Sequence, residues 1–162
     1  MGGWKTQMKI SAYVEKSYMK NRLFSLSDTD MNPDGRNEPF NNLQRHLQAS
    51  GISLQTHDII GLDSSDAILF LRLPRRFNWK RYQSKIKILL LLESEVYDKY
   101  SHDINNHHNI NYVFSWKDFE YGSKKTDGKY YKIKIPHKLP VFENTADISE
   151  RSGIVMIAAN KR

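Results

Sequence analysis

Short apolar runs alternate with polar stretches of helix length along this chain. The strongest run, residues 86–92, is closed by Glu93 and Glu95. A continuous apolar run of this length predicts a central strand of a parallel sheet, buried on both faces. In open α/β sheets, ligands bind beyond the carboxyl ends of such strands. Glu93 and Glu95 are therefore either candidate site residues or polar residues that mark where the strand meets solvent.

Further apolar runs of strand length accompany this central one. They cover residues 9–15, 52–56, 66–73, 112–116 and 130–135. A helix is predicted between the first two strands, because Phe40, Leu43 and Leu47 recur at the spacing of one helix face. Asn37 suits the cap of this helix and Gly51 suits its end. The polar residues 95–109 could hold a second, short helix.

Strands that alternate with helix-length segments predict βαβ units. The expected fold is therefore an α/β, Rossmann-like three-layer domain with a mainly parallel sheet, covering residues 1–150. Within it, residues 136–150 have the composition of a linker, with two prolines followed by acidic and polar residues. Residues 151–162 contain another apolar run. This run is either an edge strand of the same sheet or the first strand of a further domain.

Composition and charge restrict the expected cellular compartment and the expected kinds of binding partner. The chain has 162 residues, no cysteine, a net charge of +7 and a pI near 9.5. The absence of cysteine fits a reducing compartment, and no apolar leader or membrane-length run is found. The expected location is the cytoplasm, with peripheral contact to the inner membrane face as a further option. A basic surface favours nucleic acid, anionic lipid headgroups, or acidic and phosphorylated substrates.

Two polar segments could carry binding chemistry. Within residues 74–85, Arg75, Arg76, Lys80 and Arg81 are interleaved with three aromatic side chains. This pattern suits nucleic-acid stacking, an acceptor groove, an anionic membrane or an amphipathic connector with its aromatics packed inward. The connector is the favoured interpretation. His102, His107 and His108 do not share one helix face. They therefore predict a solvated loop rather than a metal cluster.

Several of these stretches together resemble the N-terminal half of family 10 glycosyltransferases, the α-1,3-fucosyltransferase family. The most specific pair is Leu-Leu-Glu-Ser at residues 91–94 and Tyr-Val-Phe-Ser-Trp at residues 112–116. The order and rough spacing of the stretches match over nearly the whole chain. The remaining stretches that carry the resemblance are residues 40–43, 51–58, 66–70, 131–136 and 155–161.

The resemblance implies one half of a two-domain GT-B architecture. In that family the N-terminal domain binds the acceptor, an oligosaccharide or glycolipid, and the C-terminal domain binds GDP-fucose. Transfer is inverting, and a carboxylate of the N-terminal domain acts as general base. Glu93 matches that carboxylate, and Glu95, Trp116 and Arg72 are candidates for the acceptor pocket around it. A cytoplasmic enzyme of bacterial type is expected.

The departure from the family pattern concerns the donor. The residues that hold GDP-fucose in the family lie beyond Arg162, so this chain is expected to carry no cofactor site and to be inactive without a donor domain. The competing hypothesis is a non-catalytic basic α/β module that binds nucleic acid or an anionic surface. As a partner, nucleic acid is less favoured than an oligosaccharide or glycolipid acceptor.

Overall fold

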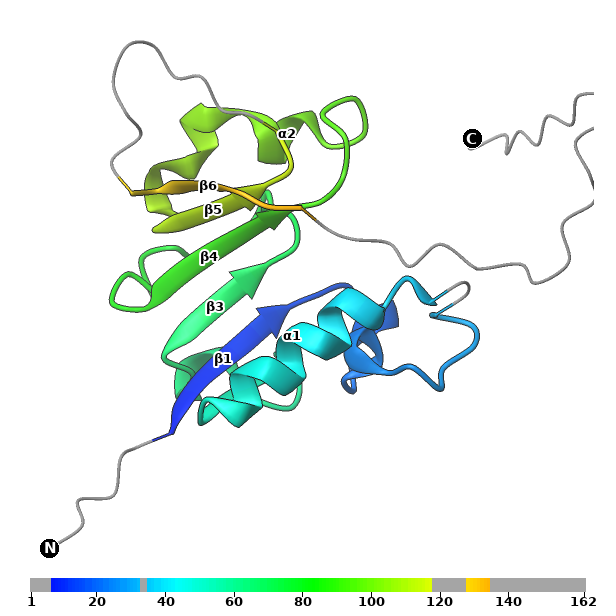
Figure 1. Cartoon of the computed structure of the whole chain (residues 1–162). Coiled ribbons are helices and arrows are strands. Elements are labelled where there is room, and N and C mark those ends of the chain that lie inside the picture. Colours follow the sequence, from blue (N-terminus) through cyan, green and yellow to red (C-terminus); the bar gives the residue numbers. More distant parts are fainter. Residues whose placement is uncertain (1–6, 33–34, 118–127, 135–162) are drawn as a thin grey trace, which may run out of the picture.

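The computed structural model describes residues 7–32, 35–117 and 128–134. These residues form one six-stranded sheet in the order β2-β1-β3-β4-β5-β6, and every neighbouring pair is parallel (Figure 1). The strands are β1 (Met8–Tyr13), β2 (Ile52–Thr56), β3 (Ala67–Phe70), β4 (Ile86–Leu91), β5 (Tyr112–Ser115) and β6 (Tyr130–Lys132). The predicted α/β fold with a parallel sheet is confirmed.

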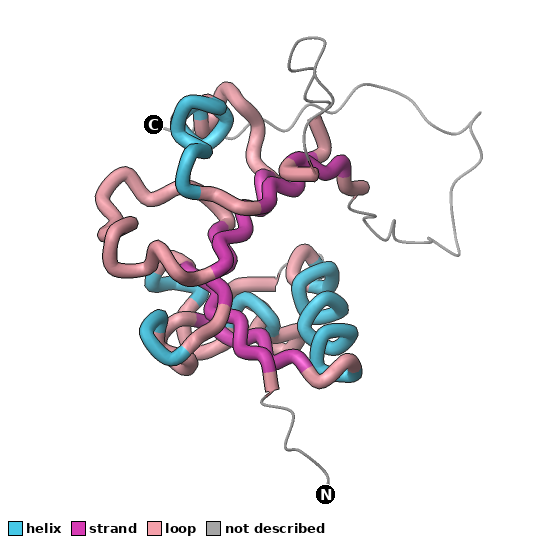
Figure 2. Tube along the Cα trace, turned by 90° about the vertical axis from the view of Figure 1, so that its left-hand side faces the viewer, coloured by secondary structure: helices cyan, strands magenta, loops and turns pink. Residues whose placement is uncertain are grey.

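The helical elements follow the polar stretches of the sequence. The longest is α1 (Glu38–Ala49), and the connection between β4 and β5 holds the short α2 (Lys99–His102) and the 3-10 helix η5 (Ile104–Asn109). Shorter 3-10 turns are η1 (Lys16–Tyr18), η2 (Arg22–Phe24) and η4 (Leu62–Ser64). Seen along the sheet, α1 lies on one side and shorter helical turns and loops lie on the other (Figure 2). The domain therefore has three layers.

The alternation of side chains along β3 builds a core on both faces of the sheet. Ala67 and Leu69 belong to the core that includes residues of β1 and β2, against which α1 packs. Ile68 and Phe70 belong to the opposite core, together with residues of β4 and β5. All four side chains of β3 are buried. This strand is the one that matches a central, doubly covered strand of a parallel sheet.

The ends of α1 agree with the sequence pattern, with one difference. Asn37 occupies the position before the helix, and Gly51 follows it with φ +75°, a conformation that glycine adopts without steric cost. The Asn37 side chain, however, does not bond to the helix. Its amide donates to the carbonyl groups of Arg22 and Ser25, because the buried turn of η2 needs donors there.

The prediction that residues 86–92 are buried on both faces is wrong for one face of β4. Leu89 and Leu91 are buried, whereas Ile88 and Leu90 are half-buried and Ile86 is exposed. The physical reason is the placement of α1, which lies over the β1 end of the sheet (Figure 1). Within the described ranges, no helix is long and apolar enough to cross a membrane.

The expected linker at residues 136–150 and the apolar run at residues 151–162 lie outside the described residues.

Candidate functional site

The strand order creates a crevice between β1 and β3. The chain leaves β1 toward β2 on one side of the sheet and leaves β3 toward β4 on the other. The loops that follow these two neighbouring strands therefore diverge. Such a topological switch point is where open α/β sheets bind their ligands.

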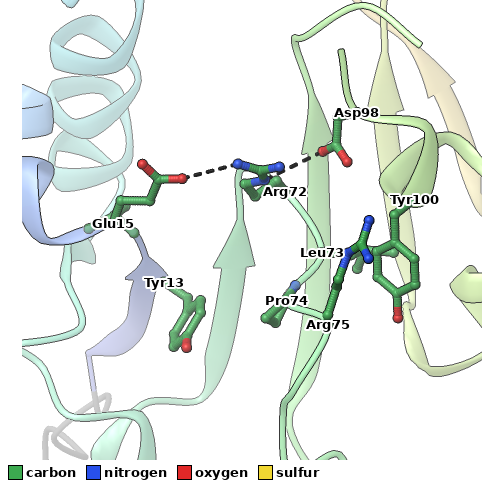
Figure 3. Close-up of a pocket in the computed structure, with 9 residues that line it drawn as sticks. Tyr13, Glu15, Arg72, Leu73, Pro74, Arg75, Asp98 and Tyr100 are labelled. Carbon is green, nitrogen blue, oxygen red and sulfur yellow. Dashed lines mark hydrogen bonds and ion pairs between the residues drawn. The ribbon is translucent and has the colours of Figure 1, made fainter. Parts of the chain in front are cut away.

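A pocket of about 320 Å³ lies at this switch point (Figure 3). One wall comes from the end of β1 and the residues after it, and a second comes from the residues after β3. The third wall is the start of α2. The lining residues are Tyr13, Val14, Glu15, Arg72, Leu73, Pro74, Arg75, Asp98 and Tyr100. We refer to this cavity as the switch-point pocket.

Arg72 connects the three walls of the pocket by ion pairs. Its Nη1 lies 3.2 Å from the Oε1 of Glu15, and its Nε lies 3.7 Å from the Oδ2 of Asp98. Figure 3 shows the guanidinium between the two carboxylates. Asp98 is buried, whereas Glu15 and Arg72 are exposed to solvent at the pocket. One arginine is thus oriented by two acidic partners from different loops.

Backbone contacts hold these walls in place. The Oδ1 of Asp98 accepts the N–H of Ser101 at 3.2 Å and so caps α2. The hydroxyl of Ser101 in turn accepts the N–H of Leu73 at 2.8 Å, which ties the loop after β3 to α2. Because both bonds are buried, breaking either one leaves a donor without a partner in the interior. The positions of Asp98 and Leu73 are therefore coupled.

Aromatic rings line the same pocket. Tyr13 packs against His57, Phe70 and Phe77, with ring centroids 4.9, 5.7 and 5.5 Å away. Tyr100 lies under the guanidinium of Arg75, which is 5.5 Å from the ring centroid. The pocket therefore combines apolar ring surfaces with convergent charged groups, the usual composition of a small-molecule site.

The residues predicted from the sequence fall in two places. Arg72 lines the switch-point pocket. Glu93, Glu95 and Trp116 do not line it, but follow β4 and β5, whose ends are adjacent in the sheet. We refer to these three residues as the β4–β5 rim. All four residues follow strands at the carboxyl edge of the sheet, and of the four only Arg72 lines the switch-point pocket.

Glu93 is exposed, and its backbone is held by a histidine. The chain turns directly after it, since the carbonyl of Ser94 accepts the N–H groups of Tyr97 and Asp98, each at 3.0 Å. The carbonyl of Glu93 accepts the Nε2–H of His102 at 2.9 Å. The main chain of Glu93 is therefore fixed by contacts that do not involve its carboxylate.

If the strand continued in extended form, Glu95 would share a face with Glu93. Glu95 is instead paired with a lysine. Its Oε2 lies 2.5 Å from the Nζ of Lys117. This hydrogen bond, supported by the charge of Lys117, lowers the pKa of Glu95 below its ordinary value. An elevated pKa, which two adjacent carboxylates would produce, is thus not found at Glu95. Trp116 is 48% exposed, so it is not a core aromatic.

The prediction that the three histidines lie in a solvated loop is wrong for two of them. His102 and His107 are buried, and only His108 is exposed. The ring nitrogens of His107 bond to the carbonyl of Ser101 at 2.8 Å and the hydroxyl of Tyr130 at 3.2 Å. These histidines pack the β4–β5 connection against the sheet. No cluster that could hold a metal ion exists among the described residues.

Residues 74–85 form the amphipathic connector that the sequence favoured. Phe77, Trp79 and Tyr82 pack against the core around Phe70, and neighbouring rings lie 4.7 to 5.3 Å apart. Arg75, Arg76, Lys80 and Arg81 are exposed. Arg81 forms an ion pair with Asp63 at 2.6 Å.

Sequence reasoning missed most of the switch-point pocket. Tyr13, Glu15, Asp98 and Tyr100 are ordinary strand-end and loop residues in the sequence, and nothing in their spacing marks them. The signal that identifies them is the strand order, because it alone places the ends of β1 and β3 side by side with a divergence between them.

Comparisons with protein-family models, with curated proteins and with solved structures found no match for this chain.

Proposed function

We propose that this chain is the acceptor-binding domain of an inverting glycosyltransferase, and that the switch-point pocket holds the acceptor saccharide. The observation that carries the proposal is the pocket itself, in which Arg72 stands between two carboxylates beside Tyr13 and Tyr100. The resemblance to family 10 glycosyltransferases supports the finer assignment, which is fucosyl transfer from GDP-fucose to an oligosaccharide or glycolipid.

The side chains of the pocket suit a sugar ring. A saccharide presents hydroxyl groups around its edge and C–H groups on its faces. Glu15 supplies carboxylate oxygens that accept from hydroxyls, and Arg72 supplies N–H groups that donate to them. Tyr13 and Tyr100 are half-buried, and the parts of their rings that line the pocket supply apolar surface for a sugar ring.

In this proposal Glu93 is the general base. A sugar hydroxyl is a weak nucleophile at neutral pH, so a carboxylate must take its proton as the new glycosidic bond forms. Glu93 lies on the same sheet edge as the pocket, at the end of the strand next to β3. The donor, GDP-fucose, would be held by a C-terminal donor domain facing that edge, and this chain would orient the acceptor only.

The competing hypothesis is a basic module that binds nucleic acid. Its strongest sequence signal was the aromatic and cationic segment at residues 74–85. Bases need exposed rings on which to stack. Tyr82 is buried, and Phe77 and Trp79 are half-buried against Phe70 and each other. None of the three is a fully exposed ring, which weakens this signal for nucleic acid.

Saccharide binding by the chain tests the proposal. Saturation-transfer NMR with a panel of neutral oligosaccharides should give contacts to the ligand ring protons. Arg72→Ala should weaken binding by roughly 10-fold or more, since charge-assisted hydrogen bonds are lost. Arg81→Ala is the matched control, because Arg81 is also an exposed arginine in an ion pair but lies outside the pocket. Absence of saccharide binding, or equal losses in the two variants, would refute the proposal.

A further inference from the structure

Of the two arginines in the switch-point pocket, only Arg72 is neutralised by nearby carboxylates. Arg72 faces both Glu15 and Asp98. Arg75 forms no ion pair with any described residue, and its contact is the ring of Tyr100. Glu15 approaches Arg72 from one side of the pocket, while Arg75 lies with Tyr100 on the other (Figure 3). The pocket therefore has one cation whose charge is not paired.

The cation–π contact with Tyr100 leaves the N–H groups of Arg75 available, since they have no hydrogen-bond partner among the described residues. A guanidinium over a ring is held by the negative face of the π-system, and its N–H groups lie in the guanidinium plane. Those groups form a fork that matches the two oxygens of a carboxylate or phosphate. Tyr100 thus orients the guanidinium of Arg75 without satisfying its donors.

The carboxylates of the pocket do not neutralise the charge of Arg75. Asp98 uses one oxygen to cap α2 and faces Arg72 with the other. Glu15 faces Arg72 as well. The chain around Arg75 is also strongly basic: residues 67–92 contain seven lysines and arginines and no aspartate or glutamate. Arg72 and Arg81 of this segment are ion-paired, but the chain as a whole carries a net charge of +7, and a net positive charge attracts anions.

We infer that the switch-point pocket recognises an anionic saccharide, whose carboxylate or phosphate group is bound by Arg75 while its sugar ring is bound by Arg72, Glu15 and the two tyrosines. This inference rests on the proposed function and names its substrate class. The ligand is a sugar ring with a single anionic substituent, and that substituent is either a carboxylate or a phosphate.

Three ligands with the same ring and different charge test the inference. Galactose, galacturonate and galactose 6-phosphate are titrated into the chain at fixed ionic strength, and dissociation constants are taken from NMR shift changes. At least one anionic sugar should bind roughly 10-fold more tightly than galactose, because a charge-assisted hydrogen bond is added. Preference for galacturonate identifies a carboxylate, and preference for galactose 6-phosphate identifies a phosphate.

Substitutions of Arg75 test whether this side chain causes the preference for anionic sugars. Arg75→Gln should reduce the ratio between the affinities for the anionic sugar and for galactose to less than about twofold, and Arg75→Lys should retain part of it. Arg76→Gln is the matched control, since Arg76 is an exposed neighbour that does not line the pocket. Unchanged thermal unfolding would show that each variant is folded. An anion preference that survives in Arg75→Gln would overturn the inference.

Two further outcomes separate this inference from the proposed function. Equal binding of all three sugars would overturn the anionic substrate class and leave saccharide binding intact. Failure of all three, and of the neutral oligosaccharides, would remove the proposed function as well. Inorganic phosphate is included as a competitor. If it binds as tightly as galactose 6-phosphate, the pocket is an anion site without a sugar subsite, and the inference is wrong.

Discussion

Buried histidines act as structural groups at the residue scale. His107 is fully buried, and its Nε2 lies 2.8 Å from a backbone carbonyl, which can only accept. Nε2 therefore carries the proton, and Nδ1 accepts from the hydroxyl of Tyr130. The ring is neutral in this arrangement. Burial is the main cause that lowers the pKa of His107, and the charges of Lys129 and His102 act in the same direction, against the opposing effects of the hydrogen bond to Ser101 and the charge of Asp103.

This lowered pKa predicts a loss of stability in acid. The unfolded chain binds a proton at His107 near its ordinary pKa of about 6.5, whereas the folded protein resists that proton. The contribution of His107 is therefore fully present above about pH 6.5 and declines as the pH falls below it, by at most about 1.4 kcal/mol per pH unit. Urea unfolding at pH 7.5 and pH 5.0 measures the decline.

The control for this prediction is the neighbouring histidine. His107→Gln should show a smaller difference between the two pH values than the unsubstituted chain, although it is less stable at both. His108→Gln should keep the full difference, because His108 is exposed and bonds only to a carbonyl of its own turn. If both variants change with pH alike, the acid sensitivity arises elsewhere.

At the element scale, an asparagine joins the connection after β1 to the end of β2. Asn21 has φ +59°, and its Oδ1 accepts the N–H of Thr56 at 2.9 Å. The N–H of Asn21 donates in return to the hydroxyl of Thr56 at 3.0 Å. Thr56 is fully buried, so its N–H depends on this partner. Asparagine suits the position because it tolerates the left-handed conformation and supplies the acceptor.

Substitution of Asn21 separates the hydrogen bond from the backbone conformation. Asn21→Ala should lower the free energy of unfolding by about 2 kcal/mol or more, because the N–H of Thr56 loses its acceptor and alanine is strained at positive φ. Asn21→Gly should cost about 1 kcal/mol less, since glycine adopts that φ freely. Urea unfolding gives both values. Equal losses would mean that the backbone conformation contributes nothing.

Lys20 provides an internal check of the same argument. It also has a positive φ, of +58°, and the bond to Asp58 comes from its backbone N–H rather than its side chain. Lys20→Gly keeps that bond and should leave the stability unchanged or raise it by up to about 1 kcal/mol.

At the scale of the whole molecule, the sequence predicted the strands and helices, because local patterns of apolar and polar residues determine them. The apolar runs located all six strands to within a few residues, and the polar stretch 95–109 did hold short helices. The burial of His107 was not predictable, because it depends on the return of the chain to Tyr130, 23 residues later. The switch-point pocket was missed for the same reason. Glu15 and Asp98 meet at Arg72 only through the strand order, which no local pattern contains.

The separation of the switch-point pocket from the β4–β5 rim leads to a prediction about catalysis. Under the proposed transferase function, and in a chain joined to a donor domain, the pocket should govern acceptor binding and Glu93 should govern the chemical step. Glu93→Gln should lower kcat for GDP release from GDP-fucose by roughly 100-fold, with little change in the KM for acceptor, because glutamine cannot accept the hydroxyl proton. Arg72→Ala should instead raise that KM.

Glu95→Gln is the matched control for the Glu93 substitution. Both residues are exposed glutamates of the β4–β5 rim, but the carboxylate of Glu95 is already engaged by Lys117. This pairing lowers the pKa of Glu95 and makes it a weaker base. Its kcat should therefore stay within a few fold of the unsubstituted enzyme. Normal turnover in Glu93→Gln, or equal losses in both variants, would remove Glu93 from the mechanism. The base would then have to be sought among the carboxylates of the switch-point pocket.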